Sequence, residues 1–296
     1  MHRHLFRAAT AIAVILIAPF AALAEEKPAY PTATLDDQHR QAMVTSGRIT
    51  AALRTEKRTV EGYEETVPVL HVFVDSKKVL EAEGVSAGEW VQGVAEVIEV
   101  DAANDLPEVV FSSYSGGAHC CTKVVIATAD RAGGWNSVDM GEWDGGGNYM
   151  EDADGDGRAE FVAADQNFLY AFDCYACSAA PVKILSVQAG KIVDVSREPR
   201  FQPKLKQWAK ALEGWRQDDG KFQPGFFAGW IAAKSMIGEG VEAWQAMQKA
   251  YKPGKDDGFE VCKDTGLFGE CAENMRATVP FPMALKSFLD HHGYRF

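Results

Sequence analysis

Apolar and polar residues alternate along much of the first two thirds of the chain. The segment VPVLHVFVDSKKVLEAEG, from Val67, and the segment VQGVAEVIEV, from Val91, both carry β-branched residues on alternating positions. A period of two is typical of strands with one buried face. The polar run Asp75-Ser76-Lys77-Lys78 stands between two such stretches and predicts a turn. The pattern therefore predicts a β-rich domain over residues 49–200.

The apolar spacing changes after Arg200. Aromatic and aliphatic residues then recur every three or four positions, which predicts amphipathic helices. Pro224 and Pro282 stand where helices can begin. The same spacing makes four tryptophans core residues rather than the lining of a sugar groove: Trp208, Trp215, Trp230 and Trp244. We predict an α+β protein whose helical region covers residues 201–296, with a leader at 25–48 that begins with the loose segment EEKPAYPTAT.

Two segments of the β-rich domain resemble each other. VDAANDLPEVVF at 100–111 aligns without gaps with DADGDGRAEFVA at 152–163. An apolar stretch and then a cysteine-bearing segment follow each copy. A repeat of this kind indicates supersecondary units that bury their faces by stacking. We therefore predict two or three blade-like β-repeats in this domain.

The second copy contains a run of alternating carboxylates. Asp152, Asp154 and Asp156 occupy positions one, three and five, Arg158 offers its carbonyl at position seven, and Glu160 stands at position nine. Calcium accepts six to eight oxygen ligands and tolerates irregular geometry, so such a loop suits Ca²⁺ better than Mg²⁺ or Zn²⁺. The first copy has Ala102 in place of Asp154, and we expect it to be a turn without metal.

The residues after the loop exclude an EF-hand. Position twelve is Ala163 instead of a glutamate, and FVAADQNFLYAF predicts a strand, a turn at 165–167 and a second strand instead of a helix. The DxDGDGxxE loop followed by a strand resembles the calcium loops of FG-GAP and VCBS-type repeats. The resemblance covers about residues 100–195. It implies a calcium site made by Asp152, Asp154, Asp156, Arg158 and Glu160, which fixes a loop between strands.

The first 24 residues have the layout of a secretory signal peptide. A basic start with Arg3 and Arg7 precedes an apolar run that is shorter than a membrane span, and Ala22-Leu23-Ala24 offers a cleavage site. We expect the mature chain to be periplasmic or secreted and to lack a membrane span. Two of the 30 basic residues lie in this segment, which leaves 28 against 42 acidic residues, a net charge of −14. Such an acidic chain is a poor partner for nucleic acid.

Export also changes the interpretation of the cysteines, because oxidising compartments favour disulfides over thiolate ligands. HCCTKV at 119–124 and CYAC at 174–177 lie at corresponding places in the two copies, which suggests a cross-link from Cys120 or Cys121 to Cys174 or Cys177. A local bond within CYAC, with a redox role, and a zinc or nucleophile site around His119 are the alternatives. Cys262 and Cys271 enclose a turn-rich octapeptide and predict a local disulfide.

The sequence offers little that points to a familiar catalytic motif. It has no HExxH or Walker motif, and GVSAG at 84–88 matches GxSxG but lies between two predicted strands, without the helix that must follow a nucleophile elbow. The glycine-rich WDGGGNY at 143–149 predicts a flexible turn. We therefore expect an exported, calcium-binding structural or interaction protein, with an envelope protein or a glycan as its partner. The alternatives are a cell-envelope hydrolase that uses unidentified carboxylates and a thiol redox protein.

Overall fold

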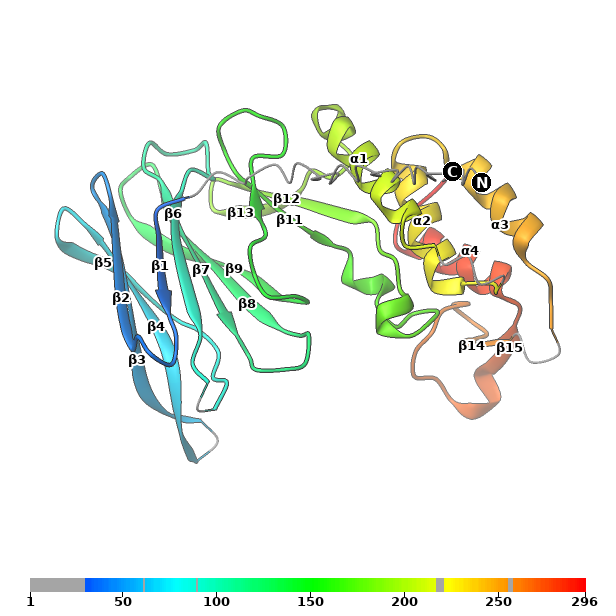
Figure 1. The fold of residues 1–296 in the computed structure, drawn as a ribbon, viewed down its shortest axis with the longest axis horizontal. Coiled ribbons are helices and arrows are strands. Elements are labelled where there is room, and N and C mark those ends of the chain that lie inside the picture. The colour runs from blue at the N-terminus through cyan, green and yellow to red at the C-terminus, as the bar shows by residue number, and fades with distance from the viewer. Residues whose placement is uncertain (1–29, 61, 89, 217–220, 255–257) are drawn as a thin grey trace, which may run out of the picture.

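The computed structural model describes residues 30–60, 62–88, 90–216, 221–254 and 258–296. The predicted signal peptide and residues 25–29 of the predicted leader lie outside the described residues. The described chain builds three antiparallel sheets, then a helical region that includes a small β-hairpin (Figure 1). The predicted α+β class, β-rich first and helical afterwards, is confirmed.

The first sheet has the order β2-β3-β4-β5 and consists of long meandering strands. Its strands are β2 (Gln41–Ser46), β3 (Ile49–Val60), β4 (Tyr63–Val74) and β5 (Lys77–Glu83). Asp75 and Ser76 connect β4 to β5 with φ angles of 47° and 66°. Left-handed residues at both central positions match the twist of a tight hairpin. The predicted turn is therefore confirmed, and it is two residues long.

The second sheet has the order β1-β6-β7-β8-β9. Its strands are β1 (Thr32–Leu35), β6 (Gly93–Ile98), β7 (Glu108–Tyr114), β8 (Thr122–Ala129) and β9 (Trp135–Trp143). The prediction of a loose leader is wrong from Thr32 onward, because β1 pairs with β6 and Leu35 is completely buried. A four-residue strand is too short to show a period in the sequence.

The first and second sheets pack face to face around one core. Leu53, Leu70 and Val72 of the first sheet share this core with Val109 and Phe111 of the second. The opposite face of the second sheet is also covered, so β7 and β8 are buried almost throughout. A sheet buried on both faces needs near-continuous apolar strands, which is why alternation is weak in this part of the sequence.

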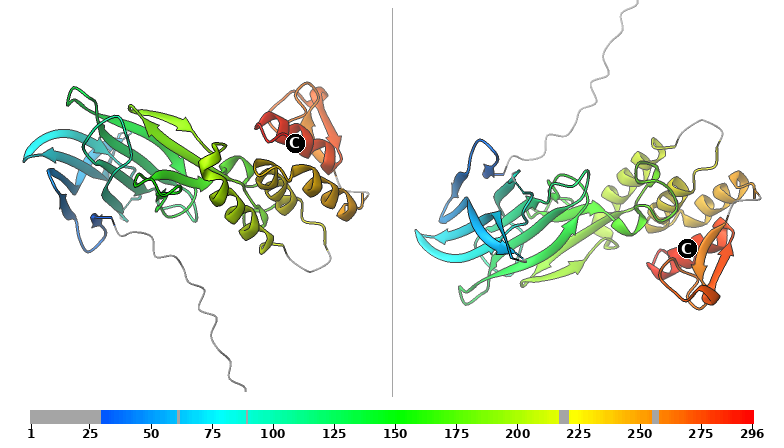
Figure 2. Two further views of the ribbon diagram at one scale, coloured as in Figure 1. Left: turned by 90° about the horizontal axis from the view of Figure 1, so that it is seen from above. Right: turned by 90° about the horizontal axis from the view of Figure 1, so that it is seen from below.

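The third sheet has the order β10-β11-β12-β13 and joins the sandwich to the helices. Its strands are β10 (Met150–Glu151), β11 (Glu160–Ala164), β12 (Val182–Gln188) and β13 (Lys191–Asp194). Phe161 and Leu185 face the second sheet, whereas Val162 and Ile184 contribute to the core under the helices. The layers follow one another along the molecule (Figures 1 and 2).

Four α-helices make up most of the C-terminal region over the residues that the structure describes: α1 (Gln202–Glu213), α2 (Pro224–Met236), α3 (Gly240–Ala250) and α4 (Phe281–His291). The predicted helices are confirmed, and prolines stand at the starts of α2 and α4. The sequence did not indicate the hairpin of β14 (Phe259–Cys262) and β15 (Arg276–Val279). No helix in the described ranges is long and apolar enough to cross a membrane.

Two local predictions need correction. The segment after β11 forms the short 3₁₀ helix η1 (Gln166–Phe168) in place of a second strand, because the Asp165 side chain caps it by accepting from the backbone N–H of Asn167. Trp208, Trp230 and Trp244 pack against the helical core as predicted. Trp215 follows the end of α1 and is 56% exposed, so its assignment to the core is wrong.

Candidate functional site

The acidic loop lies between β10 and β11, with three aspartates gathered at its tip. Carboxylate oxygens of Asp152, Asp154 and Asp156 lie within 4.8 Å of one another. Asp152 also accepts hydrogen bonds from the backbone N–H groups of Gly155, Asp156 and Gly157, which wraps the loop around that carboxylate. The donor set fits Ca²⁺, because two oxygens that each lie about 2.4 Å from one ion are separated by at most about 4.8 Å.

Basic side chains approach this cluster. The Nη1 atom of Arg200, just before α1, lies 2.9 Å from Asp154 Oδ2 and 3.9 Å from Asp156 Oδ2. The Nη1 atom of Arg158 lies 3.6 Å from Asp156 Oδ2. The negative charge of the loop therefore attracts one basic side chain from the loop itself, Arg158, and one from the segment before α1, Arg200. Arg200 makes the loop a link between the third sheet and the helical region.

Glu160 lies beneath the loop and is buried at the start of β11. Its carboxylate accepts a hydrogen bond from the Ala153 N–H over 3.0 Å. Burial raises the pKa of Glu160 to about 7 and outweighs the opposing effect of that hydrogen bond. Glu160 therefore holds the loop backbone from below, while the three aspartates gather at the tip.

The first copy of the repeat contains an equivalent glutamate. Glu108, completely buried at the start of β7, accepts from the N–H groups of Val100 and Asp101 over 2.8 and 3.0 Å. Asp101 in turn accepts from the N–H groups of Ala189 and Gly190 in the β12–β13 turn. Hydrogen bonds thus tie the first loop to the third sheet. The two copies share the loop-closing glutamate but lie in different sheets.

The six cysteines form three local pairs, so the predicted cross-link between the repeats is wrong. Cys174 precedes the 3₁₀ helix η2 (Tyr175–Cys177) and Cys177 ends it, and their sulfur atoms are 2.09 Å apart. The sulfur atoms of Cys262 and Cys271 are 2.18 Å apart. Cys120 pairs with Cys121, which a cis peptide bond joins to it immediately before β8. One 3₁₀ turn brings Cys174 close enough to Cys177 to pair locally, and the sequence had left this alternative open.

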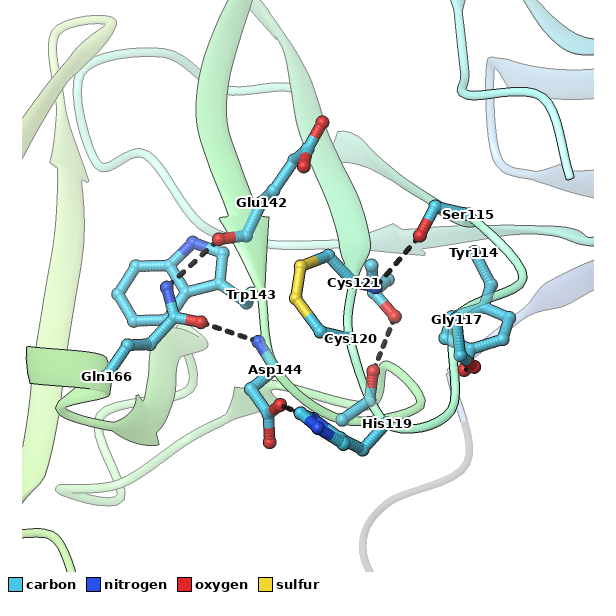
Figure 3. The surroundings of a disulfide bond; sticks show 12 residues. Tyr114, Ser115, Gly117, His119, Cys120, Cys121, Glu142, Trp143, Asp144 and Gln166 are labelled. Atoms are coloured by element: carbon cyan, nitrogen blue, oxygen red, sulfur yellow. Dashed lines mark hydrogen bonds and ion pairs between the residues drawn. A yellow bond between two sulfur atoms is a disulfide. The ribbon is translucent and has the colours of Figure 1, made fainter. Parts of the chain in front are cut away.

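His119 is the centre of a second cluster, beside the Cys120–Cys121 pair (Figure 3). Its Nδ1 atom lies 2.6 Å from Asp144 Oδ1, and its Nε2 atom lies 3.1 Å from the hydroxyl of Tyr170. The imidazole stacks on the ring of Tyr175 with centroids 3.7 Å apart and an interplanar angle of 18°. The Tyr175 hydroxyl donates to the other oxygen of Asp144, which raises the pKa of Tyr175 to about 12.

Several loops position this cluster. The Gly145 N–H donates to the His119 carbonyl over 2.8 Å, so the turn after β9 lies against the segment before β8. The Asp144 N–H donates to Gln166 Oε1 over 2.7 Å, which connects the same turn to η1 (Figure 3). The sequence had marked His119 and the glycine-rich turn separately. It gave no sign that Asp144 and Tyr170 meet at His119, because 25 and 51 residues separate them from it.

The predicted alternative of a zinc site is not assembled in the described part of the chain. Possible ligands come together there in two groups, the three loop aspartates and Asp173 with Cys174 and Cys177. The two cysteines of the second group are bonded to each other, and His119 belongs to neither group.

A cavity of about 1090 Å³ opens beside the first sheet. Its lining includes Trp90, which is 67% exposed, and the hydroxyl residues Thr55, Thr66, Ser86 and Ser115. Three of the four acidic residues in its lining, Asp37, Glu56 and Glu64, contact basic side chains. Glu56 contacts Arg54 and Arg58, and Glu64 contacts Lys57. The hydrogen bond from Arg58 lowers the pKa of Glu56. Glu56, whose pKa is lowered, is therefore a poor candidate for the protonated general acid that a glycosidase needs.

Comparison with known proteins shows where the chain belongs. Residues 201–293 match the family model of the sll0997 C-terminal domain. The chain is 35% identical over 265 residues to the probable thylakoid lumen protein sll0997 of Synechocystis sp., which covers 88% of this chain and 77% of that protein. It is also 33% identical over 215 residues to the uncharacterized protein y4bJ of Sinorhizobium fredii, covering 71% of this chain but only 33% of y4bJ. No solved structure matches the chain. At this identity and coverage, the chain belongs to the family of sll0997.

Proposed function

We propose that the protein is an exported, calcium-stabilised scaffold that acts by binding rather than by catalysis. The observation that supports this proposal is the convergence of Asp152, Asp154 and Asp156 at one loop tip. Three carboxylates so close together repel one another, and Arg200 and Arg158 bring only two positive charges against their three negative ones. Asp152, Asp154, Asp156 and the carbonyl of Arg158 would hold Ca²⁺ as in FG-GAP and VCBS-type loops, with Glu160 supporting the loop. The ion would supply charge neutralisation and hold the connection between β10 and β11.

The proposed location is the periplasm or the exterior of the cell. The related sll0997 is described as a probable thylakoid lumen protein, a compartment reached by crossing a membrane. The signal-like residues 1–24 and three cysteine pairs at bonding distance support the same location for this chain. Disulfides persist in such oxidising compartments.

The proposed partner is an envelope glycan that binds in the cavity beside the first sheet. Sugar rings stack on exposed aromatic faces, and their hydroxyl groups exchange hydrogen bonds with polar side chains. Trp90 offers such a face, and the cavity surrounds it with threonines, serines and carboxylates. An envelope protein is the competing partner.

Calorimetric titration of metal-stripped protein with Ca²⁺ tests the calcium proposal. We expect stoichiometric binding and a melting temperature that rises with Ca²⁺ and falls with chelator. At a concentration 100-fold above Kd, the stabilisation is ~2.7 kcal/mol. Asp154→Asn should abolish the Ca²⁺-dependent shift. Asp105→Asn, on the exposed part of the first loop, is the matched control and should retain it. An unchanged melting temperature in the wild type overturns the proposal.

Binding of soluble peptidoglycan fragments, measured by isothermal titration calorimetry, tests the partner. Trp90→Ala should remove the binding, whereas Trp215→Ala replaces another exposed tryptophan and should leave it intact. Equal binding by the wild type and Trp90→Ala would exclude the cavity as the glycan site. Cross-linking to an envelope protein through this cavity, without fragment binding, would favour the competing partner.

A further inference from the structure

We propose that Tyr170 is a reactive phenol, activated by His119 and Asp144, that accepts acyl groups from activated esters. The three side chains form one hydrogen-bonded chain. The Tyr170 hydroxyl lies 3.1 Å from His119 Nε2, and His119 Nδ1 lies 2.6 Å from Asp144 Oδ1. This site is separate from the calcium loop and from the cavity that contains Trp90.

The hydrogen-bond partners determine which nitrogen of His119 carries the proton. A carboxylate can only accept, and the Tyr175 hydroxyl already donates to the second oxygen of Asp144. The first oxygen of Asp144 therefore receives the Nδ1–H of His119. This leaves the lone pair of Nε2 directed at the Tyr170 hydroxyl, so that the imidazole is ready to accept the phenolic proton.

The base is held in place, while the phenol is accessible. Stacking on Tyr175 and the hydrogen bond from the Gly145 N–H to the His119 carbonyl fix the imidazole. Tyr170 is 61% exposed, so a small electrophile can reach its oxygen from solvent. The titratable groups that face His119 are Asp144 after β9, Tyr170 after η1 and Tyr175 in η2.

The chemical step is an acyl transfer. The Tyr170 oxygen attacks the carbonyl carbon of the ester, and a new C–O bond forms. The bond from that carbon to the leaving oxygen breaks, and the leaving group departs as an anion. The phenolic proton passes to His119 Nε2, and Asp144 stabilises the resulting imidazolium.

This assistance matters at neutral pH because a free phenol, with a pKa of about 10, is ionised to only about one part in 10³ at pH 7. A positioned general base typically accelerates such a step by about 10²–10⁴.

The experiment exposes the full exported chain to p-nitrophenyl acetate at pH 7 and follows acetylation of each tyrosine by peptide mass spectrometry. Tyr63, which is 76% exposed on β4, is the internal reference. We expect Tyr170 to be acetylated at least tenfold faster than Tyr63. Tyr170→Phe should remove the modification from its peptide and leave that of Tyr63 unchanged.

His119→Gln should reduce the Tyr170 rate to the level of Tyr63, because the amide still fits beside the hydroxyl but cannot take its proton. His39→Gln is the matched control. It disrupts another histidine–aspartate pair, with Nδ1 3.0 Å from Asp36 Oδ1, and should leave the Tyr170 rate unchanged. Asp144→Asn should also slow Tyr170, since the new amide donates to Nδ1 and places the proton on Nε2.

The pH dependence of the wild type gives a second measurement that does not depend on folding of a variant. The ratio of the Tyr170 rate to the Tyr63 rate should be larger at pH 7 than at pH 10, because near the pKa of a free phenol, about 10, Tyr63 loses its proton without the help of a base. The proposal is overturned if the two rates have the same size and the same pH profile. It is also overturned if natively folded His119→Gln reacts at the wild-type rate.

Discussion

The hydroxyl of Tyr294, at the end of the chain, donates a hydrogen bond over 2.7 Å to Oδ2 of Asp165, which follows β11. The two residues are 129 positions apart in sequence, and both are buried, at 6% and 3% exposure. Burial raises the pKa of Tyr294, and the neighbouring Asp165 raises it further. The phenol therefore stays protonated and remains a donor. This bond connects the C-terminal end of the helical region to the third sheet.

Tyr294→Phe should destabilise the protein by about 1–3 kcal/mol, because it leaves a buried carboxylate oxygen without its donor. Urea denaturation gives the free energy of unfolding. Tyr63→Phe, at an exposed position of β4, should change it by less than about 0.5 kcal/mol. Equal stabilities for the wild type and Tyr294→Phe would show that Lys183, whose Nζ lies 3.9 Å from the same oxygen, replaces the lost donor.

The sequence could predict the elements whose residues interact locally. Alternation identified β4 and β6, the spacing of apolar residues identified α1, α2 and α3, and Pro282 marked the start of α4. The repeat identified Glu108 and Glu160 as equivalent positions, and both close a loop at the start of a strand.

The sequence could not predict contacts between segments that lie far apart along the chain. Asp144 appeared only as part of a glycine-rich turn, and Tyr170 only as part of a predicted strand. Their meeting at His119 depends on how β9 and η1 pack, and a hydrophobic pattern specifies which face is buried but not which loops meet. The cysteine pairing failed for a related reason. Correspondence between two copies of a repeat says nothing about distance when the copies lie in different sheets.

Arg200→Gln should strengthen calcium binding. The guanidinium lies 2.9 Å from Asp154 Oδ2 and competes with the ion for the same carboxylate. Removing it should lower the Kd for Ca²⁺ several-fold in a calorimetric titration. The cost in stability without calcium should stay at ~0–1 kcal/mol, because the ion pair is partly exposed and solvent screens it.

Arg158→Gln is the charge-matched control for that titration. The substitution removes the same charge as Arg200→Gln and keeps the backbone carbonyl of residue 158. In the wild type, however, Arg158 Nη1 lies 3.6 Å from Asp156 Oδ2, a longer contact than the one that Arg200 makes. Arg158→Gln should therefore lower the Kd for Ca²⁺ by less than Arg200→Gln does. Equal changes in the two variants would mean that net charge, and not direct competition at Asp154, sets the affinity.

Glu108→Gln should change how stability depends on pH. Burial raises the pKa of Glu108, so the native state binds its proton more tightly than the unfolded chain does. The wild type therefore loses stability relative to Glu108→Gln as pH rises from the pKa of an unfolded glutamate, about 4.3, through the higher native value.

Urea denaturation at several pH values from 4.5 to about 8 shows how the difference in unfolding free energy between the wild type and Glu108→Gln changes with pH. Glu99→Gln changes the exposed residue after β6, and its unfolding free energy should depend on pH in the same way as that of the wild type. If the wild type instead gained stability over Glu108→Gln with rising pH, the hydrogen bonds from Val100, Asp101 and Asn104 would outweigh burial.

Gly229→Ala should disrupt the packing of α2 against the segment that precedes β12. A methyl group at this position would lie 2.1 Å from the Ala179 carbonyl oxygen and 2.2 Å from its carbon, so helix or segment must move. Overpacking of this kind costs about 1–3 kcal/mol, which outweighs the ~1 kcal/mol that alanine gains over glycine inside a helix. Gly146→Ala is the control, since a methyl group there has no atom within 4 Å. Thermal denaturation should show a lower melting temperature for Gly229→Ala alone. An unchanged value would mean that α2 can move away from Ala179 without loss of packing.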